Sequence, residues 1–136
     1  MKRVLFDMNV VLDVLLDRKP FADQSATAWA AIESGIAEGF LSAHAVTTIY
    51  YFVQKDRGGN YARRIISALL TVFDIAAVDQ PVIQEAMRST LADFEDSVTS
   101  TAARHAGCDY IVTRDLKGFR GSPVPPVAPA AVISLL

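Results

Sequence analysis

Residues 3–13 read RVLFDMNVVLD, and this stretch decides the fold class. Its first part, residues 3–7, is a short apolar run that ends in the carboxylate of Asp7. Apolar residues at successive positions are typical of a strand that is buried on both faces, as in a parallel sheet. Its second part predicts a helix from Val10 to Leu16 with Asn9 as the N-cap. A buried strand followed at once by a helix indicates the start of a βαβ unit.

The rest of the chain repeats this alternation. Further strands are expected at residues 38–42, 73–78 and 109–113, and helices at 20–33, 45–56, 60–70, 79–89 and 93–105. The proline-rich residues 123–129 predict a surface loop, and residues 132–136 a short edge strand. We therefore expect an α/β protein with a mostly parallel sheet of four to five strands, covered by helices on both faces. The 136 residues suit a single domain, 1–136.

Composition limits the class of protein. With 51% hydrophobic residues, the chain is expected to form a well-packed core. The only cysteine, Cys108, excludes an intramolecular disulfide framework. No apolar stretch is long enough to cross a bilayer, and Asp7 interrupts the first apolar run too early for a signal peptide, so the expected location is cytoplasmic. The net charge of −2 argues against a protein that coats nucleic acid, but allows a nuclease with a local basic rim.

Aspartates stand where the predicted strands and one helix would bring them together. Asp7 ends the first strand, Asp115 follows the strand at 109–113, and Asp96 lies in the first turn of the helix before that strand. Ligands of open α/β sheets bind at the carboxyl ends of the strands. Asp93 precedes Asp96 by one helical turn and shares its helix face. Such a set of carboxylates suits Mg²⁺ or Mn²⁺, which prefer oxygen ligands and support phosphoryl-transfer chemistry.

Polar neighbours have secondary roles in this prediction. Asn9 and Thr113 are expected to orient Asp7 and Asp115 by hydrogen bonds, without touching metal. Glu95 is expected to point elsewhere on its helix, and Asp13 and Asp17 to be solvated. His44 and His105 have no partner at metal-ligand spacing, which argues against zinc. Basic residues gather at 55–64 and 114–120, either as solvated faces or as contacts to an RNA backbone, with Arg114 and Lys117 as the candidates next to the site.

Three segments carry a family resemblance: Val4 to Asp13, Asp93-Phe94-Glu95-Asp96, and Ile111 to Asp115. Together they resemble the PIN domain family of metal-dependent ribonucleases, many of which are toxins of bacterial and archaeal toxin–antitoxin pairs. The resemblance implies a three-layer α/β/α fold and Mg²⁺- or Mn²⁺-dependent cleavage of RNA. It also implies that Asp7, Asp96 and Asp115 bind metal, that the Asp-Phe-Glu-Asp segment marks a subgroup in which Asp93 joins them, and that the protein forms a homodimer with an antitoxin as partner.

One position departs from the family pattern. Most members have a glutamate early in the helix after the second strand, and here Thr48 falls at that position. Either Asp93 supplies the missing carboxylate, or the domain is a catalytically weak module that binds RNA or a protein. A third reading is a phosphatase or phosphoacceptor domain with a similar sheet. Haloacid-dehalogenase-like phosphatases need a second aspartate two residues after the first, where this chain has Asn9.

Overall fold

Five parallel strands form the centre of the molecule in the order β3-β2-β1-β4-β5. Their bounds are Arg3–Phe6 for β1, Glu38–Ser42 for β2, Phe73–Ala76 for β3, Tyr110–Val112 for β4 and Pro126–Val127 for β5. The computed structural model describes all residues, 1–136. The first strand lies in the middle of the sheet, paired with β2 on one side and β4 on the other.

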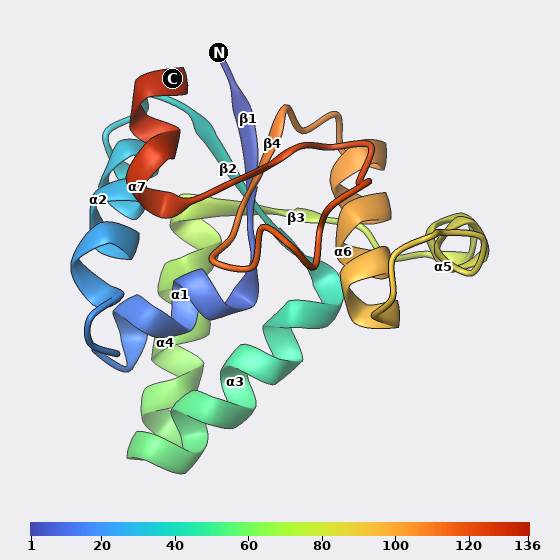
Figure 1. The fold of residues 1–136 in the computed structure, drawn as a ribbon. Helices are drawn as coiled ribbons and strands as arrows, with labels where there is room; N and C mark the ends of the chain where they lie inside the picture. The colour runs from blue at the N-terminus through green and yellow to red at the C-terminus, as the bar shows by residue number, and fades with distance from the viewer.

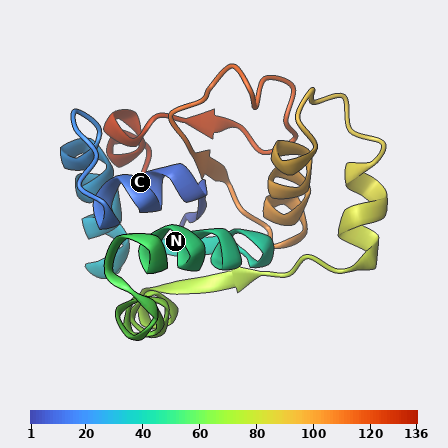
Figure 2. The same ribbon diagram turned by 90° about the horizontal axis from the view of Figure 1, so that it is seen from below.

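Helices cover both faces of this sheet (Figure 1). Their bounds are Met8–Leu15 for α1, Ala22–Glu33 for α2, Ala43–Arg57 for α3, Gly59–Val72 for α4, Gln80–Ala86 for α5, Phe94–His105 for α6 and Pro129–Val132 for α7, which a 3-10 turn at Ile133–Leu135 follows. Seen from below, α5 and α6 lie on one side of the strands and the remaining helices on the other (Figure 2). The predicted three-layer α/β/α fold with a parallel sheet is confirmed. None of the helices combines the length and the apolar sequence that a membrane-spanning segment needs.

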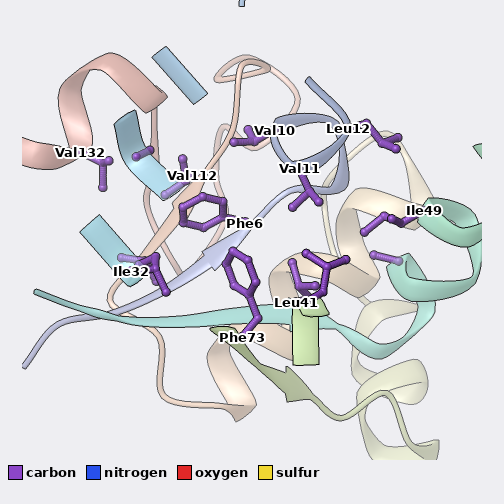
Figure 3. Packing of buried hydrophobic residues seen from close by; sticks show 14 of the residues in the cluster. Phe6, Val10, Val11, Leu12, Ile32, Leu41, Ile49, Phe73, Val112 and Val132 are labelled. Carbon is purple, nitrogen blue, oxygen red and sulfur yellow. The ribbon is translucent and has the colours of Figure 1, made fainter. Parts of the chain in front are cut away.

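The larger core packs between the sheet and the layer that contains α1 to α4. Phe73 makes an edge-on ring contact with Phe6 at a centroid distance of 5.2 Å (Figure 3). It makes a second one with Trp29 at 5.3 Å. Gly39 on β2 leaves the space that this packing needs, because a Cβ there would lie 2.6 Å from Ile32 and 2.8 Å from Phe73. Truncation of a buried phenylalanine such as Phe73 to alanine costs about 3–5 kcal/mol.

A second core lies on the other face, beneath α5 and α6. Successive side chains of a strand point to opposite faces. Accordingly Phe6 belongs to the first core, whereas Leu5 packs with Ile111, Phe119 and Ala102 in the second. Because β1 is buried on both faces, its uninterrupted apolar sequence follows from its central place in the sheet.

Local predictions near the C-terminus were partly wrong. The segment predicted as a proline-rich loop contains the edge strand β5, which pairs with β4 through Val112 and Val127. The predicted edge strand at 132–136 is instead the end of α7 and a 3-10 turn, with Val132 buried in the first core. Periodicity over five apolar residues does not separate a strand from a helical turn, and here the start of α7 at Pro129 favours the helix.

The strand order creates a switch point between β1 and β4. The chain runs from β1 to β2 and β3 on one side, whereas β4 and β5 extend the sheet on the other. Connections that leave two neighbouring parallel strands in opposite directions open a crevice at their carboxyl ends. Asp7 follows β1 and Thr113 follows β4 at this crevice, with the amide of Asp7 donating to the carbonyl of Val112 at 2.9 Å.

Candidate metal centre

Asp7 is held at the switch point by its backbone and by Thr113. It is the N-cap residue of α1, although its side chain does not cap the helix. Its carboxylate instead accepts a hydrogen bond from the buried Thr113 hydroxyl, with 2.9 Å between Thr113 Oγ1 and Asp7 Oδ2. The predicted role of Asn9 as N-cap is wrong, since Asn9 lies inside α1 and accepts from Arg18 at 3.2 Å.

Asp115 lies on the loop after β4, beside Asp7. Its backbone N–H donates to Thr113 Oγ1 at 3.0 Å, so one hydroxyl links both aspartates. Its carboxylate accepts from the N–H of Gly118 at 3.0 Å. A Cβ on Gly118 would collide with this carboxylate and lie 3.1 Å from Asp96 Oδ2. The absence of a side chain at Gly118 therefore keeps open the space between Asp96 and Asp115.

Asp93 and Asp96 come to the site from the first turn of α6. Asp93 is the N-cap residue, and its Oδ1 accepts from the backbone N–H of Asp96 at 3.0 Å. This bond confirms the capping chemistry that the sequence indicates. It also fixes the Asp93 carboxylate against the backbone of the first turn of α6. Of these two acids, Asp96 is the one on which the charges of Asp7 and Asp115 act.

The acids affect each other's protonation. Burial raises the pKa of Asp96 to about 7, and the charges of Asp93 and Asp7 add to this rise, followed by those of Asp115 and Glu95. Burial also raises the pKa of Asp7, while the Thr113 hydrogen bond opposes that rise. Carboxylates at a shared site disfavour the ionisation of one another because their negative charges repel. A bound cation would offset this repulsion.

The charge of Glu95 also acts on the aspartates, although its position on the helix predicts that its side chain points elsewhere. Among the charges that raise the pKa of Asp7, Glu95 acts more strongly than Asp115. It also contributes to the raised pKa of Asp96. Helical spacing places Glu95 off the face of Asp93 and Asp96, but its charge still reaches Asp7 at the end of β1.

Other residues singled out in the sequence turn away from the acids. Arg114 points back to α1 and binds the carboxylate of Asp13, which is completely buried, so the prediction of a solvated Asp13 is wrong. Lys117 is exposed on the loop next to Asp115. Thr48 lies half-buried on α3, one turn after His44, whose Nε2 is 3.5 Å from Thr99 Oγ1 on α6.

The donor set fits a hard divalent cation. It consists of carboxylate oxygens, which Mg²⁺ and Mn²⁺ prefer, and contains neither cysteine nor histidine. No three of these side chains already stand at direct coordination distances. Mg²⁺ commonly keeps several of its waters and contacts only one or two carboxylates directly, so the wider spacing is compatible with it. None of the surface hollows is lined by the four aspartates.

The fold and this acid-lined edge define a class: a three-layer α/β protein with a candidate metal centre at its switch point. Within that class, the family model of the PIN domain matches residues 3–117, and the chain belongs to the PIN domain family. A search of curated protein sequences finds no match.

Solved structures of similar fold include several toxins. A toxin–antitoxin complex from Klebsiella pneumoniae has a TM-score of 0.70 and 20% identity, over 93% of this chain and 97% of that one. VapC20 from Mycobacterium tuberculosis, described as a toxin that cleaves the sarcin–ricin loop, has a TM-score of 0.70 and 14% identity, over 87% and 94%. VapBC2 from Rickettsia felis, bound to a DNA fragment from the promoter, has a TM-score of 0.69 and 11% identity, over 93% and 98%. At these identities the likeness concerns the fold.

Proposed function

We propose that this protein is a Mg²⁺- or Mn²⁺-dependent endoribonuclease of the toxin type. The observation that supports the proposal is the grouping of Asp7, Asp96 and Asp115, which come from three separate elements. The Thr113 hydroxyl links Asp7 to the backbone of Asp115, and a Cβ on Gly118 would contact both Asp96 and Asp115. Membership of the PIN domain family supports a nuclease function. We assign the acidic segment 93–96 to a subgroup of that family, and the whole chain to one domain.

Asp7, Asp96 and Asp115 are the proposed metal ligands, with Asp93 as a fourth acid. Bound divalent ions supply an activated water and neutralise charge on the scissile phosphate. The residues of the chain prepare the site for them. The Thr113 hydroxyl donates to Asp7, which leaves the second oxygen of that carboxylate for a ligand. Because the pKa of Asp96 is about 7, binding of the cation is expected to displace a proton from Asp96 near neutral pH. Burial raises the pKa of Asp7 in the same direction.

The RNA backbone needs cations near this acidic edge. Lys117 is exposed beside Asp115 and remains the proposed phosphate contact next to the site. Arg114 is less suited, because its guanidinium already binds Asp13. The basic residues between Lys55 and Arg64 lie on the α3–α4 hairpin and extend the proposed contact surface. Binding is then expected to weaken as the salt concentration rises.

Similarity to toxin–antitoxin complexes supports an antitoxin as the partner. The proposed location remains the cytoplasm. For the proposed homodimer, helices α2 and α4 are the candidate faces. Leu70 is exposed on α4. The buried centre of a homodimer interface is commonly formed by such apolar side chains. Size-exclusion chromatography with light scattering, compared for wild type and Leu70→Glu, tests this face. An unchanged dimer in the variant excludes it.

The function is tested by cleavage of structured and single-stranded RNAs with Mn²⁺, with EDTA, and with the variant Asp7→Asn. Wild type is expected to cleave only with the metal, and Asp7→Asn is expected to lose activity while its circular dichroism spectrum is retained. Asp74→Asn is a matched control, because Asp74 is an exposed aspartate on the edge strand β3. Cleavage that survives both EDTA and Asp7→Asn contradicts the proposal.

A second candidate function is a binding module without efficient catalysis. The threonine at position 48 supports it, since a hydroxyl brings no charge to the place where most of the family has a glutamate. RNA binding that persists in EDTA without any cleavage favours this module, whereas robust metal-dependent turnover excludes it.

A further inference from the structure

An ion pair between the buried Asp13 and the partly exposed Arg114 joins the loop of Asp115 to helix α1. Asp13 is 0% exposed, and its carboxylate accepts from Arg114 Nε at 2.7 Å and from Arg114 Nη2 at 3.1 Å. Ser25 Oγ donates a further bond at 3.2 Å. Two parallel N–H···O bonds fix the orientation of a guanidinium as well as its distance. The pair therefore holds Arg114 in one geometry.

Arg114 stands between two residues of the candidate metal centre. Thr113 donates to Asp7 at 2.9 Å, and the backbone N–H of Asp115 donates to Thr113 at 3.0 Å. Thr113 and Asp115 thus belong to the candidate metal centre, whereas Arg114 between them points to Asp13 on α1. Asp7 and Asp13 stand at the start and in the middle of α1. The loop is consequently attached to this helix at two points.

We propose that the Asp13–Arg114 pair is a clamp that positions Asp7 and Asp115 to bind the metal, and that Arg114 is a positioning residue. The inference rests on the proposed function, because it concerns the same site. The ring of Phe21 lies over the guanidinium, 3.9 Å from ring centroid to Cζ, and covers one of its faces. Arg114 is therefore used within the protein and not by the RNA phosphate.

An ion pair with a buried partner could instead serve only the stability of the fold. Replacement of such a pair by apolar residues of similar volume is often neutral or stabilising, whereas removal of one partner leaves a buried charge. The double variant Asp13→Leu/Arg114→Met therefore keeps the packing but loses the directional bonds. The single variant Arg114→Lys keeps the charge but loses the planar fork. Arg120→Met is the matched control, because Arg120 is an exposed arginine on the same loop.

Two readouts test the clamp. The first is hydrogen exchange of the amides of residues 113–118, which reports on the loop without any metal or RNA. In the double variant and in Arg114→Lys we expect the exchange of these amides to rise about ten-fold or more relative to the amides of β1. The second is Mn²⁺ affinity by calorimetry. Loss of a group that orients metal ligands typically weakens binding about 10–100-fold, and we expect this for both variants but not for Arg120→Met.

The outcomes separate the clamp from the proposed function. Exchange and Mn²⁺ affinity equal to wild type in Arg114→Lys and in the double variant overturn the clamp. If the double variant does not fold, Arg114→Lys alone decides by the same two measurements. A wild type that binds no Mn²⁺ contradicts the proposed function, while the exchange measurement still decides whether the pair holds the loop.

Discussion

Asp96 allows a prediction in which stability and function oppose each other. Burial and the neighbouring acids raise its pKa from 3.8 to about 7 in the metal-free protein. A shift of one pKa unit corresponds to about 1.4 kcal/mol, so this difference would lower the free energy of unfolding by about 4 kcal/mol when Asp96 is ionised. Because Asp96 is partly exposed, solvent screening reduces the effect to about 1–2 kcal/mol. The variant Asp96→Asn, which removes the charge but keeps the shape, is therefore expected to stabilise the metal-free protein at neutral pH.

The sign of this effect depends on pH. Below pH 4 the carboxyl is protonated in both the folded and the unfolded protein, so the variant gains nothing. Between pH 4 and 7 the folded protein binds the proton more tightly than the unfolded one, and wild type loses stability as the pH rises. Above pH 7 the full difference is expected, a Tm higher by about 3–8 °C in Asp96→Asn. Thermal unfolding in EDTA at pH 4, 6 and 8 measures it, with Asp74→Asn as control. A variant that is less stable than wild type at pH 8, or a difference independent of pH, refutes the reasoning.

Further predictions concern the neighbours of the aspartates. Thr113→Val removes the bonds to Asp7 and to the Asp115 amide in a buried place, and urea denaturation is expected to show a loss of about 1–3 kcal/mol. Gly118→Ala places a Cβ against Asp115, so Mn²⁺ affinity by calorimetry is expected to fall, whereas Gly59→Ala, where the Cβ meets only an ordinary contact, leaves it unchanged. Thr48→Glu restores the carboxylate that is usual in the family and is expected to increase the rate of RNA cleavage; no change in rate indicates that the site does not need a carboxylate at this position. Glu95→Gln is expected to lower the pKa of Asp7, measured by NMR titration, and an unaltered titration contradicts the effect of Glu95 on Asp7.

The strand-helix pattern was sufficient to predict the architecture because both strands of the switch point have distinctive sequences. Val4 to Phe6 of the first strand are buried and apolar, and Asp7 follows them directly. Asp115 lies on the loop after β4, and Asp93 and Asp96 lie at the start of α6. Short elements near the C-terminus were less predictable. Two residues, Pro126 and Val127, form β5, and so short a strand depends on pairing with β4 and not on its own periodicity.

Long-range contacts explain the errors at the site. Asp13 has the sequence context of a solvated helix position, but Arg114, which is far along the chain, makes its burial possible. Asn9 is a good N-cap by residue type, yet Asp7 takes that position because the backbone turns into α1 directly after β1. The effect of Glu95 on Asp7 depends on the tertiary arrangement, which helical spacing alone does not predict.

The central claim is that the acids at the switch point hold a divalent cation used for RNA hydrolysis. Calorimetric titration of Mn²⁺ into wild type and Asp96→Asn, followed by RNA cleavage with the same samples, tests it most directly. Wild type is expected to bind Mn²⁺ and release protons at pH 6–7, and to cleave RNA, while Asp96→Asn remains folded and does neither. Equal Mn²⁺ binding by the two proteins, or RNA cleavage by Asp96→Asn at the wild-type rate, contradicts the claim.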